Sequence, residues 1–264
     1  MRPWGLAPMN FVEPFFAKRT PRELVVMLVC VGANFAVMAF CAGYLLFEYR
    51  VSGATWLQII GAVGIGYFAA DFASGFVHWG VDTWFSDRNF GRAIAIAREH
   101  HTHPQNILGY SFLEQSTLGS APSAAFIGPA ALFTAWLPVS VATYALTIVW
   151  LISSTCLFFG TSFHNLAHQP PKSRIIRFAQ KLNLVITPQH HWQHHRDGQL
   201  VRYCAVNGWA NYICDPLRIW RRLEWLVHAL TGAVPRRDDL EWQGRYAETG
   251  TLQWYPPRIR KNKA

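Results

Sequence analysis

Histidines give the first chemical signal in this chain. Ten of the eleven histidines fall between His78 and His195, and several recur at helical spacing. His78 and Asp82 are four residues apart, as are His164 and His168, so on a helix each pair would share one face. Imidazole and carboxylate groups are common metal ligands. Each pair is therefore predicted to hold one metal ion.

Two further clusters add imidazoles. In the run His190–His195, positions 191, 194 and 195 project together on a helix, whereas His190 aligns only with position 194 and is the weaker candidate. The segment Arg98-Glu-His-His-Thr-His-Pro104 supplies two or three more imidazoles. Because adjacent helical residues point about 100° apart, His100 and His101 are expected to face different ions.

The number of candidate ligands favours a binuclear site. A single zinc takes about four ligands, often including thiolates, whereas two ions with roughly four ligands each would use this set and leave positions for O2. The five cysteines are odd in number and contain no Cys-x-x-Cys pair, which argues against a thiolate site. Imidazole suits iron, copper, zinc or nickel. Two carboxylates are candidates for orienting the ligands from a second layer: Asp71, seven residues before His78, and Glu99.

Membrane spans are the elements that must position these histidines. The chain is 51% hydrophobic and 15% charged, and Leu24–Phe47 contains no charged residue. These 24 residues would form roughly 36 Å of helix, enough to cross a ~30 Å hydrocarbon core. Further uncharged runs cover Val51–Ala70 and Leu118–His164, the latter divided at Pro138. The predicted spans are residues 24–48, 51–79, 119–137 and 139–168.

Positive charge predicts the orientation of these spans. Of the 24 Lys and Arg residues, only Arg50 falls on the side opposite the others. By the positive-inside rule, both termini, the loop between the second and third spans, and the metal site face the cytoplasm of a bacterial inner membrane or an equivalent membrane. Orientation and anionic headgroups account for the net charge of +9, and no basic module interleaved with aromatic residues indicates nucleic-acid binding.

The predicted fold class is an all-α integral membrane protein with four transmembrane helices and a cytoplasmic helical cap that carries a His-rich di-metal site. Gly61, Gly64 and Gly66 are expected to allow close helix packing in the second span. An amphipathic helix over 172–185, a histidine-bearing helix over 188–197, and a helix over 215–230 starting at Asp215-Pro216 are predicted after the spans. The chain divides into an interfacial segment 1–23, a transmembrane region 24–168 with a His-bearing loop 80–118, surface helices 169–234, and a charged tail 235–264.

Five segments resemble a known family of lipid desaturases, which includes plasmanylethanolamine desaturase, the bacterial CarF proteins and the plant plastid phosphatidylglycerol trans-3 desaturase. The similar segments span roughly residues 55 to 225: Asp71-Phe-Ala-Ser-Gly-Phe-Val-His-Trp-Gly-Val-Asp-Thr-Trp84, Arg98-Glu-His-His101, His164-Asn-Leu-Ala-His168, His190-His-Trp-Gln-His-His195, and Asn207-Gly-Trp-Ala-Asn211 followed by Trp220-Arg-Arg-Leu-Glu224. The chain departs from the family pattern at Ser116, where asparagine is expected, and in the additional His103.

The resemblance implies a pair of iron ions, O2 as cosubstrate, and two electrons from a reduced carrier of the cytochrome b5 or ferredoxin type. The implied substrate is a membrane phospholipid, with the O-alkyl chain of an ether phospholipid preferred, so that a plasmanyl lipid becomes a plasmenyl lipid with a vinyl ether. The ligand set that carries over, with His190 and Asp82 as additional candidates, is His78, His100, His101, His164, His168, His191, His194 and His195.

Other functions fit the same residues. An acyl-lipid desaturase or a hydroxylase would use the same di-iron site, whereas a zinc-dependent membrane hydrolase would need neither O2 nor a reductant. A non-catalytic membrane sensor is a third class. Several aromatic residues, including Trp79, Trp84, Phe85, Trp192 and Trp209, would line either a lipid channel or the interfacial belt.

Overall fold

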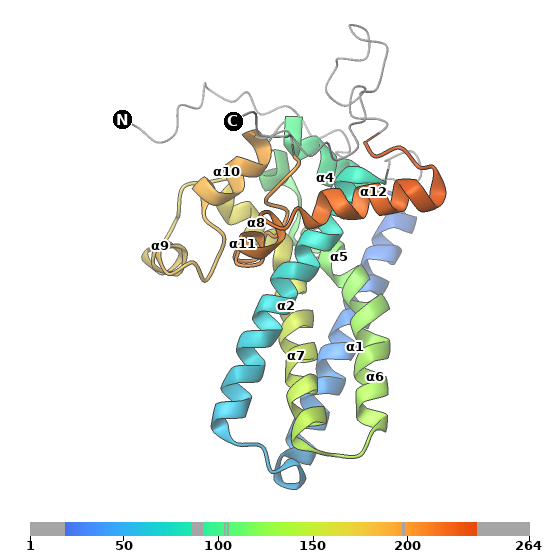
Figure 1. Cartoon of the computed structure of the whole chain (residues 1–264), viewed down its shortest axis with the longest axis vertical. Helices are drawn as coiled ribbons and strands as arrows, with labels where there is room; N and C mark the ends of the chain where they lie inside the picture. The colour runs from blue at the N-terminus through green and yellow to red at the C-terminus, as the bar shows by residue number, and fades with distance from the viewer. Residues whose placement is uncertain (1–18, 86–91, 103, 105, 197–198, 237–264) are drawn as a thin grey trace, which may run out of the picture.

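Four long apolar helices form the body of the protein. The computed structural model describes residues 19–85, 92–102, 104, 106–196 and 199–236, and this part of the chain contains helices and no strand. The helices long and apolar enough to cross a membrane are Pro21–Ser52 (α1), Trp56–Thr83 (α2), Phe112–Trp136 and Val141–Phe158 (α7). Figure 1 shows them running together, with the shorter helices gathered at one end. The predicted fold class is confirmed.

Each spanning helix begins with a capping box. The Thr20 hydroxyl accepts from the backbone N–H of Glu23, and the Glu23 carboxylate accepts from the backbone N–H of Thr20. This arrangement satisfies N–H groups of the first turn that have no partner within the helix. The same reciprocal bonds begin the other three helices, at Thr55 with Gln58, Ser111 with Glu114, and Ser140 with Thr143.

The third span begins earlier than the sequence predicted. It consists of Phe112–Pro122 (α5), a π-helical turn Ser123–Ile127 (η2) and Gly128–Trp136 (α6), so it starts at residue 112 rather than 119. The predicted span began only after the polar segment Glu114–Thr117, but these side chains are buried and Glu114 caps the helix. The π-helical turn follows Pro122, which cannot donate the regular helical hydrogen bond.

The fourth span ends earlier than predicted. A single helix over 139–168 was expected, but α7 ends at Phe158 and a separate short helix, Gly160–Ala167 (α8), follows. The break falls at Phe159, directly before Gly160, and glycine is a weak helix former. His164 therefore lies on its own helix in the cap, and His168 directly follows that helix.

Helix α7 is central in the bundle and packs against both α1 and α2. Ala62 of α2 and Tyr144, Ile148 and Val149 of α7 form one buried apolar cluster. The outward faces carry large exposed apolar side chains, such as Phe47 at 84% exposure. Such faces are expected where lipid, rather than water, surrounds the helices.

The shorter helices form a cap at one end of the bundle, as Figure 1 shows. They are Arg92–Thr102 (α4), the 3-10 turn Asn106–Gly109 (η1), α8, Arg174–Lys181 (α9), Pro188–Arg196 (α10), Asn211–Cys214 (α11) and Ile219–Thr231 (α12). The predicted helix over 215–230 thus begins at Ile219. Asp215 does not cap it, because its carboxylate accepts from the backbone N–H of Arg202 and pairs with the Arg202 guanidinium at 3.2 Å.

Helix α9 is the amphipathic surface helix that the sequence predicted, although it is shorter than the expected range of 172–185. Ile175 and Phe178 are 81% and 61% exposed, and Arg174, Arg177 and Lys181 lie on the same helix. An amphipathic helix of this composition suits the membrane interface.

One of the three glycines expected to allow close packing in α2 does so. A Cβ on Gly66 would lie 2.9 Å from the Ile152 Cβ and 3.1 Å from the Val149 backbone, so α7 approaches there. A Cβ on Gly61 or Gly64 would meet nothing within 4 Å, so at these two positions the expectation is wrong.

Replacing Gly66 with alanine is expected to destabilise the bundle, because the new methyl group would overpack the contact with α7. Overpacking of this kind typically costs about 1–3 kcal/mol. Gly64→Ala, on the same helix, is the matched control and should be neutral or stabilising. Thermal unfolding in detergent would measure the difference, and equal melting temperatures for the two variants would contradict the packing.

Candidate metal centre

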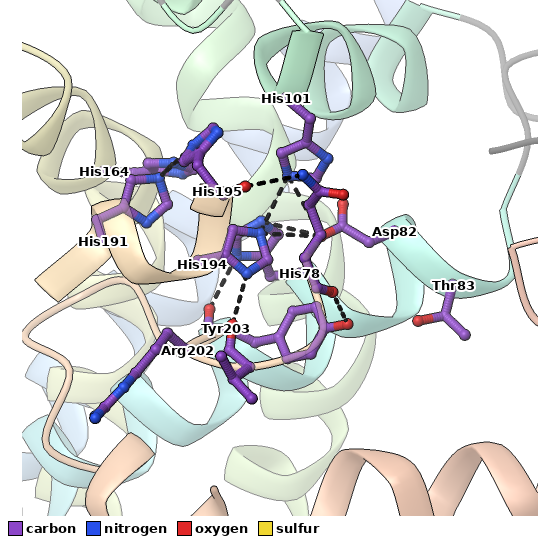
Figure 2. A network of polar contacts seen from close by, with 12 residues as sticks. His78, Asp82, Thr83, His101, His164, His191, His194, His195, Arg202 and Tyr203 are labelled. Carbon is purple, nitrogen blue, oxygen red and sulfur yellow. Dashed lines mark hydrogen bonds and ion pairs between the residues drawn. The ribbon is translucent and has the colours of Figure 1, made fainter. Parts of the chain in front are cut away.

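The structure brings nine of the predicted site residues together in the cap. Within each of two groups, the ligand atoms all lie within 4.8 Å of one another. The first group contains five imidazoles, from His100, His164, His168, His191 and His195. The second contains three imidazoles and a carboxylate, from His78, His101, His194 and Asp82. Figure 2 shows side chains of both groups directed toward one another from different helices.

The first group has the spacing of ligands around one ion. The Nε2 atom of His164 lies 2.7 Å from that of His191 and 3.0 Å from that of His168, and the His168 and His191 Nε2 atoms are 3.0 Å apart. The His195 Nε2 atom is 3.0 Å from that of His191. Metal–nitrogen bonds of ~2.1 Å at right angles would separate neighbouring nitrogens by about 3.0 Å. The triangle of nitrogens therefore fits ligands on one face of an ion.

The second group is arranged around Asp82. One carboxylate oxygen lies 3.3 Å from the Nε2 of His78, 3.4 Å from that of His194 and 3.5 Å from that of His101. The His101 and His194 Nε2 atoms are 3.1 Å apart. Asp82, which was predicted only as an additional candidate, thus lies at the centre of this group.

Backbone carbonyls fix two of these imidazoles in the tautomer that a metal needs. The Nδ1–H of His78 donates to the Tyr203 carbonyl at 2.9 Å, and the Nδ1–H of His194 donates to the Val201 carbonyl at 2.7 Å (Figure 2). In each ring the proton then resides on Nδ1, so the Nε2 lone pair is directed into the group.

The surroundings of several cap histidines favour the neutral imidazole. Burial, followed by the neighbouring imidazoles, lowers the pKa of His100, His164 and His191 well below the ordinary value, and burial and His100 do the same for His101. Neutral imidazole is the form that binds metal. Among the described residues, both ring nitrogens of His100, the Nε2 of His78 and both oxygens of Asp82 are buried without a hydrogen-bond partner. A cation in each group would satisfy these atoms, so the residues fit a metal pair.

Helical geometry divides neighbouring histidines between the two groups. His100 and His101 of α4 fall in different groups, as their rotation about the helix predicted. On α10, His191 and His195 join the first group and His194 joins the second. Positions 191, 194 and 195 were expected to project together. The structure instead divides them between the two groups.

His190 lies outside both groups. Its Nε2 accepts a hydrogen bond from the Asn211 amide at 2.8 Å, and burial, followed by the charge of Arg202, lowers its pKa to about 4. Gly208, with φ +82°, approaches so closely that a Cβ there would lie 2.7 Å from this nitrogen. His190 thus supports a loop, contrary to its candidacy as a ligand. His103 and the side chain of Glu99 lie outside the described residues.

The sequence had suggested that Asp71 orients His78. In the structure Asp71 supports the same loop as His190 instead. One oxygen of its carboxylate accepts from the backbone N–H groups of Val206, Asn207 and Gly208 at 2.9–3.0 Å. The other oxygen accepts from the N–H of Ala210 at 2.9 Å. Asp71 acts on the ligands indirectly, because the segment it holds continues into the carbonyls that orient His78 and His194.

A buried polar network beside the second group was missed by the sequence analysis. Arg236 donates from its backbone N–H to the Thr83 carbonyl at 2.7 Å, and its guanidinium donates to the Tyr203 hydroxyl at 2.9 Å and to the Glu224 carboxylate. Thr83 directly follows Asp82, and Tyr203 supplies the carbonyl that orients His78. The network therefore supports two members of the second group, Asp82 and His78. The only signal in the sequence was Glu224 at the end of the Trp220–Glu224 motif.

An apolar pocket reaches both groups from the side of the spanning helices. Three ligand residues line it, His78 from the second group and His100 and His164 from the first. The other lining residues are mostly apolar or small and include Val77, Val81, Ile96, Ala97, Ile107, Leu118, Gly119, Leu157, Gly160 and Ala205. A hydrocarbon chain in this pocket would lie against both candidate metal positions.

The fold and the site together define a multi-span membrane protein with a histidine-rich metal centre beside an apolar pocket. Residues 67–238 match the lipid desaturase domain family, and the chain belongs to that family. It is therefore an enzyme of the oxidoreductase class, a lipid desaturase.

Three relatives illustrate the breadth of the similarity. The chain is 32% identical to plasmanylethanolamine desaturase of Myxococcus xanthus, over 78% of this chain and 74% of that protein. It is 33% identical to plasmanylethanolamine desaturase 1 of Mus musculus, over 71% of each chain. It is 26% identical to chloroplastic fatty acid desaturase 4 of Arabidopsis thaliana, over 65% of this chain and 52% of that one. No solved structure matches the chain.

Asp71→Asn is expected to lower both stability and metal retention, because the amide group would turn a donor toward backbone N–H groups that need an acceptor. Hydrogen bonds to a charged group are worth about 1.5–3 kcal/mol each, so we expect a loss on the order of 3 kcal/mol. Glu48→Gln, in α1, is the control for loss of one carboxylate. Chemical unfolding and metal analysis after dialysis would measure the effect, and metal retention equal to that of the control would refute the role of Asp71.

Proposed function

We propose that this protein is a di-iron lipid desaturase that uses O2 and two external electrons to introduce a double bond into the chain of a membrane phospholipid. The observation that carries the proposal is the apolar pocket lined by His78, His100 and His164, because it brings a hydrocarbon chain against both ligand groups at once.

The donor set supports iron. The groups offer eight imidazoles and one carboxylate and no thiolate, and imidazole with carboxylate suits iron with open positions. Five nitrogens in the first group exceed the four ligands of a structural zinc site. Nitrogens ~3.0 Å apart also fit right-angled ligands better than tetrahedral ones, which would lie about 3.4 Å apart at the same bond length.

Bound iron would supply the oxidising power that removes hydrogen from an unactivated methylene, which no side chain provides as an acid or base. The chain's own residues position the substrate and exclude water. Val77, Ile96 and Leu157 offer apolar contacts to a lipid chain, and His100 and His164 lie where that chain meets the metal groups. Buried ligands and an apolar approach keep the reaction away from bulk water.

The preferred substrate is the O-alkyl chain of an ether phospholipid, which would give the vinyl ether of a plasmalogen. The two relatives named plasmanylethanolamine desaturase support this choice, since each is similar to the chain over more than two thirds of its length. An acyl-lipid desaturase is the second candidate, favoured by the similarity to fatty acid desaturase 4.

The orientation in the membrane is also part of the proposal. The bundle is capped at one end by the histidine-bearing helices, and the short connections Gly53–Thr55 and Leu137–Ser140 lie at the other end (Figure 1). Arg50 lies near the latter end, and the other Lys and Arg residues belong with the cap or the termini. The positive-inside rule then places the metal centre in the cytoplasm. A reduced carrier of the cytochrome b5 or ferredoxin type would reach it there.

Purified protein is expected to contain roughly two iron ions per chain, one in each group. His168→Ala in the first group and His194→Ala in the second should each lower the iron content and abolish desaturation. His190→Gln, which keeps an acceptor for the Asn211 amide, is the matched control and should retain iron. Elemental analysis would test this, and zinc in place of iron, with activity that needs neither O2 nor reductant, would favour the hydrolase instead.

Cells that express the protein and contain ether phospholipids are expected to accumulate plasmenyl lipids. Mild acid should release fatty aldehyde from their lipid extracts, because a vinyl ether hydrolyses to an aldehyde. Mass spectrometry should show loss of two hydrogens rather than gain of one oxygen, which separates desaturation from hydroxylation. A new acyl double bond without aldehyde would move the assignment to an acyl-lipid desaturase.

Gly160→Leu tests whether the lipid chain occupies the pocket in this experiment. A Cβ on Gly160 meets nothing within 4 Å, so the larger side chain can extend into the pocket without striking the backbone. The variant should retain iron and lose most of the product. Full product formation would show that the lipid chain does not use this pocket.

A further inference from the structure

We propose that the outer face of α10, centred on Trp192, is where an acidic one-electron carrier protein docks and passes electrons through His195 to the metal groups. This inference rests on the proposed function, because it assumes that the metal centre is reduced from outside. It adds the place of reduction and the chemistry of the partner's surface.

The metal centre has two different sides. The apolar pocket reaches it through His78, His100 and His164. His195 and His101 do not line that pocket, and they are partly exposed, whereas the other four histidines of the first group are buried. The substrate chain and the reductant can therefore approach from different directions, without competing for space.

Trp192 packs against His195, and neither residue lines the pocket. Its indole is 48% exposed and stacks on the ring of His195, with centroids 6.2 Å apart and planes inclined by 17°. The Nε2 of His195 in turn lies 3.0 Å from that of His191, inside the first group. A molecule in contact with Trp192 is thus separated from the candidate ligand His195 by one ring, and from the first group's metal position by two stacked rings. Because electron transfer weakens steeply with distance, this short path favours reduction from α10.

The outer face of α10 has the composition of a docking surface. Gln189, Trp192 and Arg196 are exposed and spaced three and four residues apart, so they share one side of the helix. An exposed tryptophan near an arginine is typical of residues that dominate protein interfaces. In Figure 1, α10 lies at the end of the cap away from the spanning helices, where a water-soluble partner can reach it.

Charge selects an acidic partner. Helix α10 contains Arg196 and no acidic residue, and the adjoining helix α9 is also basic without an acidic residue. Over residues 169–222 basic side chains prevail, with Lys172, Arg174, Arg177, Lys181, Arg196, Arg202, Arg218, Arg221 and Arg222 against Asp197 and Asp215. Arg202 pairs with Asp215 and Arg221 with Glu224, so these two do not add to the excess. Such a surface attracts an acidic carrier and speeds their encounter at low salt.

The electrons balance with two docking events per turnover. Each carrier gives up one electron and leaves oxidised, and two such electrons with two protons join O2 and the two hydrogens removed from the lipid to form two molecules of water. The carrier is the reductant, and the lipid and O2 are the other reactants of the proposed function.

The test compares Trp192→Ala and Arg196→Glu with Trp225→Ala, which removes a tryptophan of similar exposure (52%) from α12 on another part of the cap. The probes are a soluble cytochrome b5 domain and a plant-type ferredoxin, with dithionite as a small reductant. Trp192→Ala and Arg196→Glu should lower carrier-driven desaturation and carrier affinity by on the order of tenfold. Neither change should alter dithionite-driven desaturation or iron content, and Trp225→Ala should match the wild type throughout.

Carrier binding to the purified, metal-loaded protein without lipid gives a second measurement that does not depend on turnover, and it should weaken in the same two variants and with added salt. Unchanged carrier-driven rates in Trp192→Ala, equal losses with dithionite, or failure of both carriers to bind the wild type would overturn the inference. Failure of the wild type to form an alkene even with dithionite and O2 would instead overturn the proposed function.

Discussion

The metal centre depends on one buried carboxylate in the second span. Asp71 accepts four hydrogen bonds from backbone N–H groups of residues 206–210, and so it fixes a loop that has no regular secondary structure of its own. The carbonyls that orient His78 and His194 precede this loop in the same segment. A carboxylate suits this position because it accepts several hydrogen bonds at once, each stronger than a bond to a neutral acceptor. The same span therefore supplies two of the four candidate ligands of the second group, His78 and Asp82, and also the carboxylate that supports the segment orienting His78 and His194.

Most ligands could be predicted from the sequence because helix geometry is local. Residues four apart on a helix lie on one face whatever surrounds them, which is why His78 with Asp82 and His164 with His168 each fall in one group. The assignment of His100 and His101 to different groups follows from the same geometry. The spans could also be predicted from sequence, since an uncharged run long enough to cross a bilayer is recognised without information about its neighbours.

The support of the ligands could not be predicted because it depends on contacts between distant segments. A backbone carbonyl, such as that of Tyr203, has no side-chain signature, and the hydrogen bonds of Asp71 reach residues more than 130 positions away. His190 shows the converse, since its sequence context matches that of its neighbours but its ring is directed to Asn211. Local pattern also missed the break between α7 and α8, which falls at Phe159 within a continuous uncharged run.

The candidate ligands of both groups come from α2, α4, α8 with its C-cap His168, and α10, and the segments between them contain two of the four spans. During synthesis the first ligand, His78, leaves the ribosome long before His194 and His195. Neither cage can close until all four spans have been made and α10 has emerged. Metal loading of these groups would therefore be a late step of biogenesis, and until then the early histidines would be open to any transition metal in the surroundings. The order of affinities among divalent metals would then make control of metal supply, rather than the cage alone, responsible for correct loading.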